Sequence, residues 1–322
     1  MNSVDEWEVA RVTSIREVAS DVRLFEIEPS GAAVPYGPGS HINVGVIVDG
    51  EQQRRSYSLV GEPSSGVYRI AVKRLPDSRG GSVYMWSLAE NARIDITRPN
   101  NHFELSRRDS QYLLMAGGIG ITPIYGMALA LLRRGANFRL VYAARSIAEM
   151  AFAEQLREQL GERLELYPED ARGFVNIDGE VSKLSGDGEL YICGPVGMLE
   201  AVKRSWRDQK RSPGALRFET FGSTGHHPSE GFEVTIRNLG RRISVPRNKS
   251  LLEAIEAEGI EMISNCRRGE CGVCVVTVVD ADQEIDHRDV FFSDEQKAES
   301  SKMCACVSRA TGGHLLIETS DR

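Results

Sequence analysis

Five of the six cysteines in this 322-residue chain lie between positions 266 and 306, and their spacing constrains the fold more than any other feature. Three form the run Cys266-Arg-Arg-Gly-Glu-Cys271-Gly-Val-Cys274, and Cys304 and Cys306 follow. The N-terminal residues lack the basic and apolar regions of a signal peptide, so we expect a cytoplasmic protein, whose thiols stay reduced. Cysteines clustered in this way predict thiolates that converge on a metal or a cluster.

The C-x4-C-x2-C spacing is typical of a plant-type [2Fe–2S] cluster, whose fourth ligand arrives later in the chain. Gly269 and Gly272 would let backbone N–H groups approach the sulfurs. Zinc is the alternative, but it usually takes its ligands as two short pairs, and the second pair is poor here. Cys304 and Cys306 differ by one strand pleat and would face the same side, so the spacing leaves the fourth ligand open.

Composition gives no overall signal for a nucleic-acid or membrane partner, although it leaves a local basic patch open. Hydrophobic residues make up 41% of the chain and charged residues 26%, which is ordinary for a globular protein. The net charge of −7 provides no overall basic field for nucleic acid or an anionic membrane. No stretch is long and apolar enough to span a bilayer.

Three patterns follow one another along the chain. Short alternating strands between about residues 8 and 97 predict a closed or nearly closed antiparallel barrel. Strands at 112–115, 138–143 and 190–193 alternate with helices, one of them from about 123 to 134, and predict a parallel sheet. After a linker at 222–231, a hairpin, a helix and a further strand surround the cysteine loop.

Two Ser-x-x-Glu sequences are candidate capping boxes, in which serine and glutamate each bind a backbone N–H of the other. The first, Ser146 with Glu149, predicts a helix from this point to about Leu160. The second, Ser250 with Glu253, predicts a helix to about Glu258.

A glycine-rich turn, Gly117-Gly-Ile-Gly-Ile-Thr-Pro123, follows the first strand of the predicted parallel sheet. Backbone N–H groups at such a turn and the start of the next helix form an anion site. Pro123 distinguishes it from the G-x-G-x-x-G fingerprint. Cys193-Gly-Pro195 ends a later strand, and both turns would lie at the carboxyl edge, where ligands bind. Tight packing of the turn, and a core position for Cys193, are the alternatives.

Two basic motifs lie in the predicted barrel. Arg54-Arg55-Ser56-Tyr57-Ser58 offers a ring, a phosphate partner and hydroxyl groups. Lys73 precedes Arg79-Gly80-Gly81-Ser82, which suits a phosphate cradle. Solvated charges and a plain turn are the alternatives.

His287-Arg-Asp289 shares three residues with the kinase catalytic loop, but the residues that follow do not fit it. Together with Asp286, we interpret the segment as a surface loop and a candidate docking surface.

R-x-Y-S, GGIGITP, CGP and C-x4-C-x2-C occur in this order, and over nearly its whole length the chain resembles the ferredoxin-NADP reductase superfamily. Their order is similar to that of the phthalate dioxygenase reductase family. The resemblance implies an antiparallel flavin-binding barrel (1–107), a parallel α/β NAD-binding domain (108–224) and a C-terminal β-grasp ferredoxin domain (225–322).

The resemblance also implies the site residues and cofactors. FMN, in preference to FAD, would contact Arg55, Ser56, Tyr57, Ser58, Val72, Lys73, Gly80, Gly81 and Ser82, with Phe221 covering it. NADH would contact Gly117, Gly118, Gly120, Thr122, Pro123, Cys193, Gly194 and Pro195. Ser58, Thr122 and Cys193 would be the catalytic residues. Cys306-Val-Ser-Arg-Ala310 resembles the family's last-ligand motif, so the cluster ligands would be Cys266, Cys271, Cys274 and Cys306; Cys304 is a departure.

The implied activity is that of an NADH-dependent reductase for a Rieske-type aromatic-ring oxygenase or demethylase. A hydride would pass from NADH to FMN, and single electrons would then pass through the cluster to the oxygenase. Arg145 lies where a partner for the 2′-phosphate of NADPH could sit. The alternatives are a flavin reductase or diaphorase, and a ferredoxin-like carrier or zinc-binding adaptor without enzymatic activity.

Overall fold

The computed structural model describes residues 6–62, 66–75, 80–108, 110–221 and 227–319. Two compact units form, one of Ser3–Glu219 and one that contains Thr220–Arg322. No helix within the described ranges is long and apolar enough to cross a membrane. The boundaries expected at 107/108 and 224/225 stay predictions, and the second lies outside the described residues.

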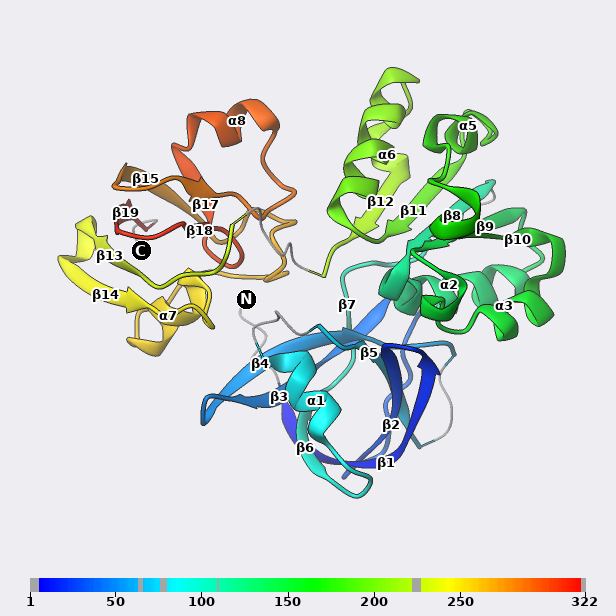
Figure 1. Ribbon diagram of the computed structural model, residues 1–322, viewed down its shortest axis with the longest axis horizontal. Coiled ribbons are helices and arrows are strands. Elements are labelled where there is room, and N and C mark those ends of the chain that lie inside the picture. Colours follow the sequence, from blue (N-terminus) through cyan, green and yellow to red (C-terminus); the bar gives the residue numbers. More distant parts are fainter. Residues whose placement is uncertain (1–5, 63–65, 76–79, 109, 222–226, 320–322) are drawn as a thin grey trace. The chain divides into compact units, whose positions relative to one another are not determined.

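The N-terminal half of the unit Ser3–Glu219 is an antiparallel barrel (Figure 1). Its strands pair in the order β4-β3-β6-β1-β2-β5, with β7 beside β3, and a bridge between Leu59 and Ile70 closes the barrel. Alternate side chains such as Ile27, Val44 and Ile96 fill the interior, so the barrel predicted from the sequence is confirmed. Its elements are β1 (Trp7–Ala19), β2 (Val22–Pro29), β3 (Ser40–Val48), β4 (Glu51–Ser58), β5 (Tyr68–Lys73), α1 (Gly81–Ser87), β6 (Arg93–Thr97) and β7 (Asn100–Asn101).

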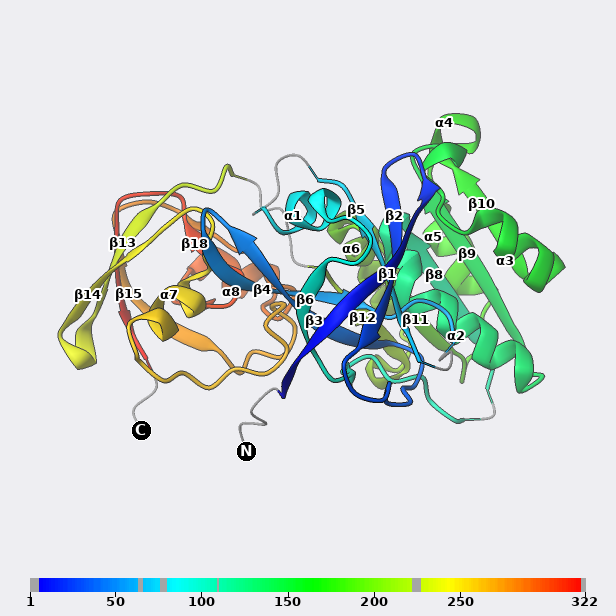
Figure 2. The same ribbon diagram turned by 90° about the horizontal axis from the view of Figure 1, so that it is seen from below.

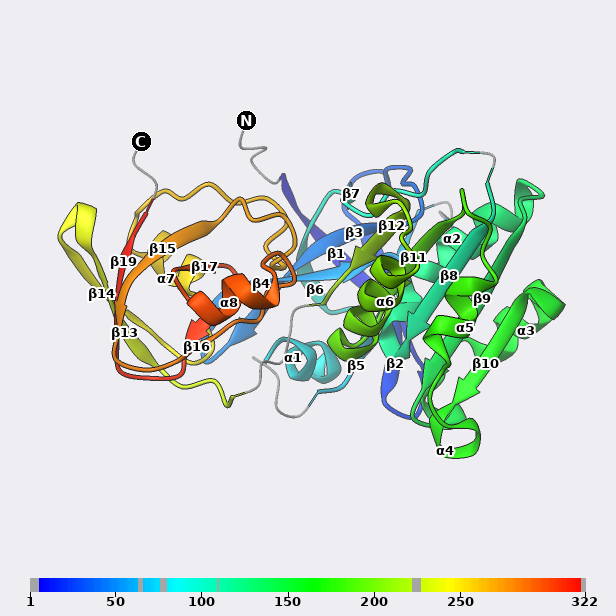
Figure 3. The ribbon, with the colours of Figure 1, turned by 90° about the horizontal axis from the view of Figure 1, so that it is seen from above.

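The second half of this unit is a five-stranded parallel sheet in the order β10-β9-β8-β11-β12. Figure 1 and Figure 3 show α2 and α3 on one face and α5 and α6 on the other, as expected when crossovers are right-handed and their direction reverses. The elements are β8 (Tyr112–Gly117), α2 (Ile121–Arg133), β9 (Phe138–Ala144), α3 (Ala153–Leu160), β10 (Leu164–Pro168), α4 (Glu169–Arg172), α5 (Ile177–Ser182), β11 (Glu189–Cys193), α6 (Val196–Asp208) and β12 (Leu216–Glu219).

The unit Thr220–Arg322 is a β-grasp domain (Figure 2). Its sheet has the order β14-β13-β19-β15-β17, in which only β13 and β19 are parallel. Leu251, Leu252 and Ile255 of α7 are buried in its core. The elements are β13 (Phe232–Ile236), β14 (Arg241–Val245), α7 (Leu251–Ala257), β15 (Val275–Ala281), β16 (Ile285–Asp286), α8 (Asp294–Glu299), β17 (Lys302–Cys304), β18 (Arg309–Ala310) and β19 (His314–Glu318).

The two predicted capping boxes have different outcomes. Ser250 and Glu253 form the reciprocal bonds at the start of α7, so this prediction is confirmed. The prediction at Ser146 is wrong, because a short 3-10 turn (Ile147–Glu149) follows it and α3 begins only at Ala153. The Glu149 carboxylate instead accepts a hydrogen bond from Lys73 at 2.9 Å.

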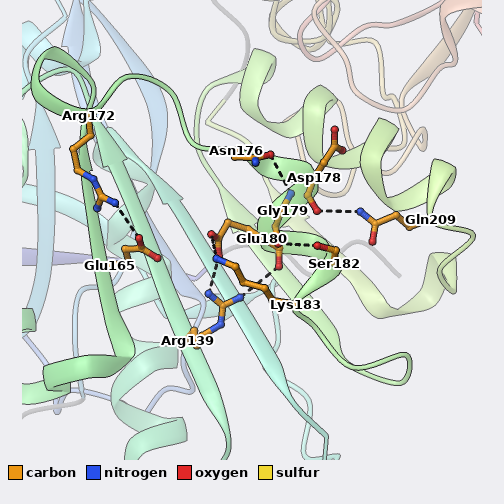
Figure 4. A network of polar contacts seen from close by, with 10 residues as sticks. All are labelled: Arg139, Glu165, Arg172, Asn176, Asp178, Gly179, Glu180, Ser182, Lys183 and Gln209. Atoms are coloured by element: carbon orange, nitrogen blue, oxygen red, sulfur yellow. Dashed lines mark hydrogen bonds and ion pairs between the residues drawn. The ribbon is translucent and has the colours of Figure 1, made fainter.

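A buried carboxylate fixes α5 to the parallel sheet (Figure 4). Oε2 of Glu180 accepts a bond from Arg139 on β9 at 2.7 Å, and Oε1 accepts one from Lys183 at 2.6 Å. Burial acts to raise the pKa of Glu180, but the bonds from Lys183 and Arg139 outweigh it and lower the pKa overall. A charged carboxylate therefore links the crossover from β10 to β11 to strand β9.

We expect Glu180→Gln to lower the free energy of unfolding by about 2–3 kcal/mol, because hydrogen bonds to a buried charge are lost. The wild-type contribution is fully present above the ordinary glutamate pKa of 4.5 and is lost as the pH falls through the lowered pKa. Urea titrations at neutral and acidic pH measure both effects. Glu165→Gln, which breaks an exposed pair with Arg172, is the control and should change stability by less than about 1 kcal/mol. Equal effects of the two variants would contradict the prediction.

Candidate functional site

The strand order of the parallel sheet reverses between β8 and β11, which are neighbours. Cys193 at the end of β11 pairs with Ala116 on β8, so the two turns predicted to bind a ligand start side by side at the carboxyl edge. Ligands of open parallel sheets bind at such a reversal point. The sequence-based placement of both turns at one edge is confirmed.

Glycine is required where these turns meet. A Cβ on Gly120 would lie 2.0 Å from the Cys193 carbonyl oxygen, and one on Gly117 would lie 2.5 Å from Cδ of Pro195. Gly118 has a φ of +53° with open space beside it, which leaves its backbone accessible. Thr122 Oγ1 donates a hydrogen bond to the Ile119 carbonyl at 3.0 Å, and Pro123 is buried in α2. Gly194 packs on Gly117, and Pro195 occupies the N-cap position of α6.

A hydrogen bond joins the barrel to this edge of the sheet. Ser58 at the end of β4 donates from Oγ to Oε2 of Glu219 at 3.1 Å, and both side chains are buried. Glu219 in turn pairs with Cys193 in the register of β11 and β12. The predicted catalytic serine of the barrel therefore lies close to the predicted nicotinamide-site cysteine.

Glu219 is a functional candidate that sequence reasoning missed. It lies in the segment Phe218-Glu-Thr-Phe221, which resembles the end of the reductase half, but no role was assigned to it. The available signal was an acidic residue between two aromatic ones, Phe218 and Phe221, since a fully buried carboxylate needs a partner. Its partner, Ser58, is 161 residues away in sequence, so only the fold identifies it.

Arg55 and Gly81 come together as the phosphate motif requires. A Cβ on Gly81 would lie 2.7 Å from Cγ of Arg55, so the arginine lies across the start of α1. Its guanidinium donates to Oε1 of Gln53 at 2.6 Å. Gly80 packs on Val48, and Ser82 Oγ bonds to the backbone of Leu75. Arg79 lies outside the described residues.

The structure gives Lys73 a different set of neighbours. Its ammonium is 2.9 Å from Oδ2 of Asp21 and 2.9 Å from Oε2 of Glu149. These two carboxylates raise its pKa against the lowering effect of burial. Lys73 thus joins the barrel to the nucleotide-binding half, and its predicted contact with a flavin phosphate stays a prediction.

The other predicted flavin residues have well-defined surroundings. Burial raises the pKa of the Tyr57 phenol and the charge of Arg55 offsets only part of this, so the ring stays neutral. Ser56 Oγ donates to Oδ1 of Asn43 at 2.6 Å, and Val72 lies in the barrel core. Phe221 is exposed and belongs to the other unit, so its predicted place over the flavin stays a prediction.

The cysteines of the β-grasp domain form two neighbouring sets. The thiols of Cys266 and Cys271 are hydrogen-bonded to each other, and the Arg268 N–H points at Cys266 Sγ at 3.4 Å. Cys274 accepts hydrogen bonds from the thiols of both Cys304 and Cys306. These bonds hold the pKa of Cys274 well below the ordinary value of a thiol. Several buried thiols around one negative charge suit a site for iron, because iron binds thiolates and neutralises their charge.

Cys304 and Cys306 differ in what else they face. The Cys306 sulfur accepts a hydrogen bond from the Gly269 N–H, and it interacts electrostatically with Cys266 across the cysteine loop. Cys304 ends β17, is fully buried, and faces Asp289 as well as the other two thiols. Cys306 is therefore the one better placed to share a cluster with Cys266.

The interpretation of residues 286–289 as a surface loop is wrong. Asp286, Arg288 and Asp289 are all at least nine-tenths buried. Arg288 donates to Oδ2 of Asp286 at 2.7 Å, and Asp289 accepts from the Phe292 N–H and the Ser308 hydroxyl. Charged side chains can be buried when they are paired. Their partners cannot be identified from the sequence, so a segment rich in charged residues is easily taken for an exposed one.

Three family models match successive parts of the chain. They describe an oxidoreductase FAD-binding domain at residues 9–105, an oxidoreductase NAD-binding domain at 114–204 and a 2Fe-2S iron-sulfur cluster binding domain at 234–311. The predictions of a flavin, an NAD and a cluster domain are confirmed at this level.

Relatives resemble the chain over nearly its full length. The toluene-4-sulfonate monooxygenase system reductase subunit of Comamonas testosteroni is 34% identical, covering 95% of this chain and 97% of its own. The heme-dependent oxidative N-demethylase beta subunit of Ectopseudomonas mendocina (strain ymp) is also 34% identical, covering 96% and 97%. The solved structure of phthalate dioxygenase reductase superposes with a TM-score of 0.82 at 28% identity, covering 97% and 98%.

We expect Cys306→Ser to lose most of the iron and acid-labile sulfide, and Cys304→Ser to retain both, because only Cys306 faces Cys266 and the Gly269 N–H. Iron and sulfide analysis of the two purified variants, with their visible absorption spectra, measures the difference. Loss of the cluster in Cys304→Ser and its retention in Cys306→Ser would reverse the ligand assignment.

Proposed function

The chain belongs to the phthalate dioxygenase reductase family, and we propose that within it this protein uses FMN and NADH to supply electrons to a Rieske-type oxygenase. The family's activity is electron transfer from a pyridine nucleotide through a flavin to a [2Fe–2S] cluster. Bound flavin accepts two electrons as a hydride and releases them singly, and a [2Fe–2S] cluster carries one at a time.

The observation that carries the proposal is the bond between Ser58 and Glu219. It joins the strand of the flavin motif to the strand beside Cys193, at the reversal point of the parallel sheet. A hydride donor and its acceptor must be held within about 3–3.5 Å of each other in line. Because these residues come from two different domains, the bond fixes the two halves of such a site together.

The side chains of this chain bind and orient, since hydride transfer needs no acid–base pair. Arg55 and the backbone at Gly81 would take the FMN phosphate, and Tyr57 would lie against the ring system. The Ser58 hydroxyl, bonded to Glu219, would be held near the reactive nitrogen. Gly118 and Gly120 would let the dinucleotide approach the backbone at the start of α2.

The preference for NADH is supported by the residues next to Arg145. The Asp170 N–H donates to the Arg145 carbonyl at 3.0 Å, which brings Glu169 and Asp170 beside the end of β9. Carboxylates at this edge favour ribose hydroxyls and disfavour a 2′-phosphate. We therefore infer that Arg145 does not serve NADPH.

In the β-grasp domain, Cys266 and Cys271 would bind one iron, and Cys274 and Cys306 the other. Backbone N–H groups such as that of Arg268 would donate to the sulfurs and tune the potential. A potential of roughly −400 mV, typical of plant-type clusters, suits delivery of electrons to a Rieske centre. A haem-dependent enzyme is the alternative acceptor, because one relative is named as the beta subunit of a heme-dependent oxidative N-demethylase.

Anaerobic titration of the purified protein with NADH tests the proposal. Flavin and cluster absorption should bleach with about 1.5 NADH per chain, because the flavin takes two electrons and the cluster one. NADPH should be at least about tenfold poorer in kcat/KM, and the flavin released by heat should be FMN. Electron delivery should be faster to a Rieske oxygenase than to a haem oxygenase. A chain whose flavin bleaches while its cluster does not would contradict the proposed electron path.

We expect Ser58→Ala to slow flavin reduction by NADH about tenfold to a hundredfold, because the group that orients the site and its bond to Glu219 are lost. Stopped-flow absorption at the flavin band measures the rate. Ser87→Ala, at the exposed end of α1, is the matched control and should leave the rate unchanged. A Ser58→Ala variant as fast as the wild type would show that the bond does not serve hydride transfer.

A further inference from the structure

The buried segment Asp286–Asp289 has no part in the electron path described so far. It lies beside the cysteine loop, because the Val290 N–H donates to the Gly269 carbonyl at 3.0 Å. A Cβ on Gly269 would lie 2.9 Å from Cα of Asp289, so the two backbones are in direct contact. Asp289 therefore packs against the turn that brings the Gly269 N–H to Cys306.

Asp289 also holds the segment that follows the fourth cysteine. Its Oδ1 accepts a hydrogen bond from Ser308 Oγ at 3.0 Å, and its Oδ2 accepts one from the Phe292 N–H at 2.9 Å. Its backbone carbonyl accepts from Lys297 Nζ at 2.7 Å. One residue thus connects the first half of the cysteine loop, the chain after Cys306 and helix α8.

The carboxylate is charged although it is only 2% exposed. Burial acts to raise the pKa of Asp289, but His287, the Phe292 N–H, Lys297 and Ser308 together lower it. Its charge lies close to the sulfurs, because Asp289 faces the buried Cys304. A fixed negative charge this close to a cluster opposes the addition of an electron.

We propose that Asp289 sets the reduction potential of the cluster, by holding the Gly269 turn and Ser308 in place and by keeping a buried negative charge beside the thiolates. The proposal rests on the cluster assignment above, but not on NADH, FMN or the identity of the acceptor. It explains why a carboxylate is buried here with several donors, where an apolar residue would fill the core at lower cost.

The test is a redox titration of the full chain with dithionite and mediators, in which the EPR signal of the reduced cluster is followed. Asp289→Asn keeps the size and removes the charge, so the midpoint potential should rise. With an effective dielectric constant of about 20, one charge on the order of 10 Å away changes an equilibrium constant roughly tenfold. For one electron, this is about 59 mV. Asp289→Glu retains the charge and should return the potential toward that of the wild type.

Two controls separate this role from general effects of charge or folding. Glu299→Gln removes one charge at the exposed end of α8 and should shift the potential much less, since solvent screens it. Iron and sulfide content shows whether each variant holds its cluster, independently of NADH oxidation. If Asp289→Asn holds its cluster at an unchanged potential, the proposal is wrong.

Ser308→Ala keeps the proposal testable if Asp289→Asn loses iron. It leaves the carboxylate charged and removes one donor to it, so the potential should move downward, opposite to the shift in Asp289→Asn. An unchanged or raised potential in Ser308→Ala would overturn the proposal.

Discussion

The hydrogen bond from Ser58 to Glu219 connects the barrel to the parallel sheet at the candidate site. Apolar side chains of both halves share one core, and within this junction the buried Glu219 carboxylate needs the donor that Ser58 supplies, since a buried carboxylate without a donor is costly. The pairing of Glu219 with Cys193, and the contact of Gly120 with the Cys193 carbonyl, extend this junction to the nucleotide turn. The candidate site thus lies where the barrel adjoins the parallel sheet.

The β-grasp domain holds several thiols close together. Its cysteine loop leaves the regular sheet and is supported by backbone contacts, such as that between Gly269 and Val290. Behind the loop lies a buried ionic segment where an apolar core would suffice for folding. Buried polar groups that are hydrogen-bonded to one another, such as Asp289 and Ser308, can fix one arrangement of a loop. This fits a site in which small changes of geometry alter a potential.

Local sequence signals succeeded where no distant residue competed for them. At Ser250 and Glu253 both capping bonds form, because both side chains find their partners within one helical turn. At Ser146 the same pattern fails, because Lys73, from another part of the chain, binds the Glu149 carboxylate and the helix starts later. Residues 286–289 were misjudged for the same reason, since their partners Ser308 and Lys297 are remote or lie beyond the motif.

The barrel, the parallel sheet, the cluster domain and the order of the motifs could be predicted, because they follow from local periodicity and from ligand spacing. The carboxylate that meets Ser58, the cations around Glu180 and the different surroundings of Cys304 and Cys306 are seen only in the folded chain. The surroundings and the charge state of a polar side chain depend on the residue with which it pairs. Which residue becomes the partner depends on how the chain packs, and this cannot be predicted from a pattern along the sequence.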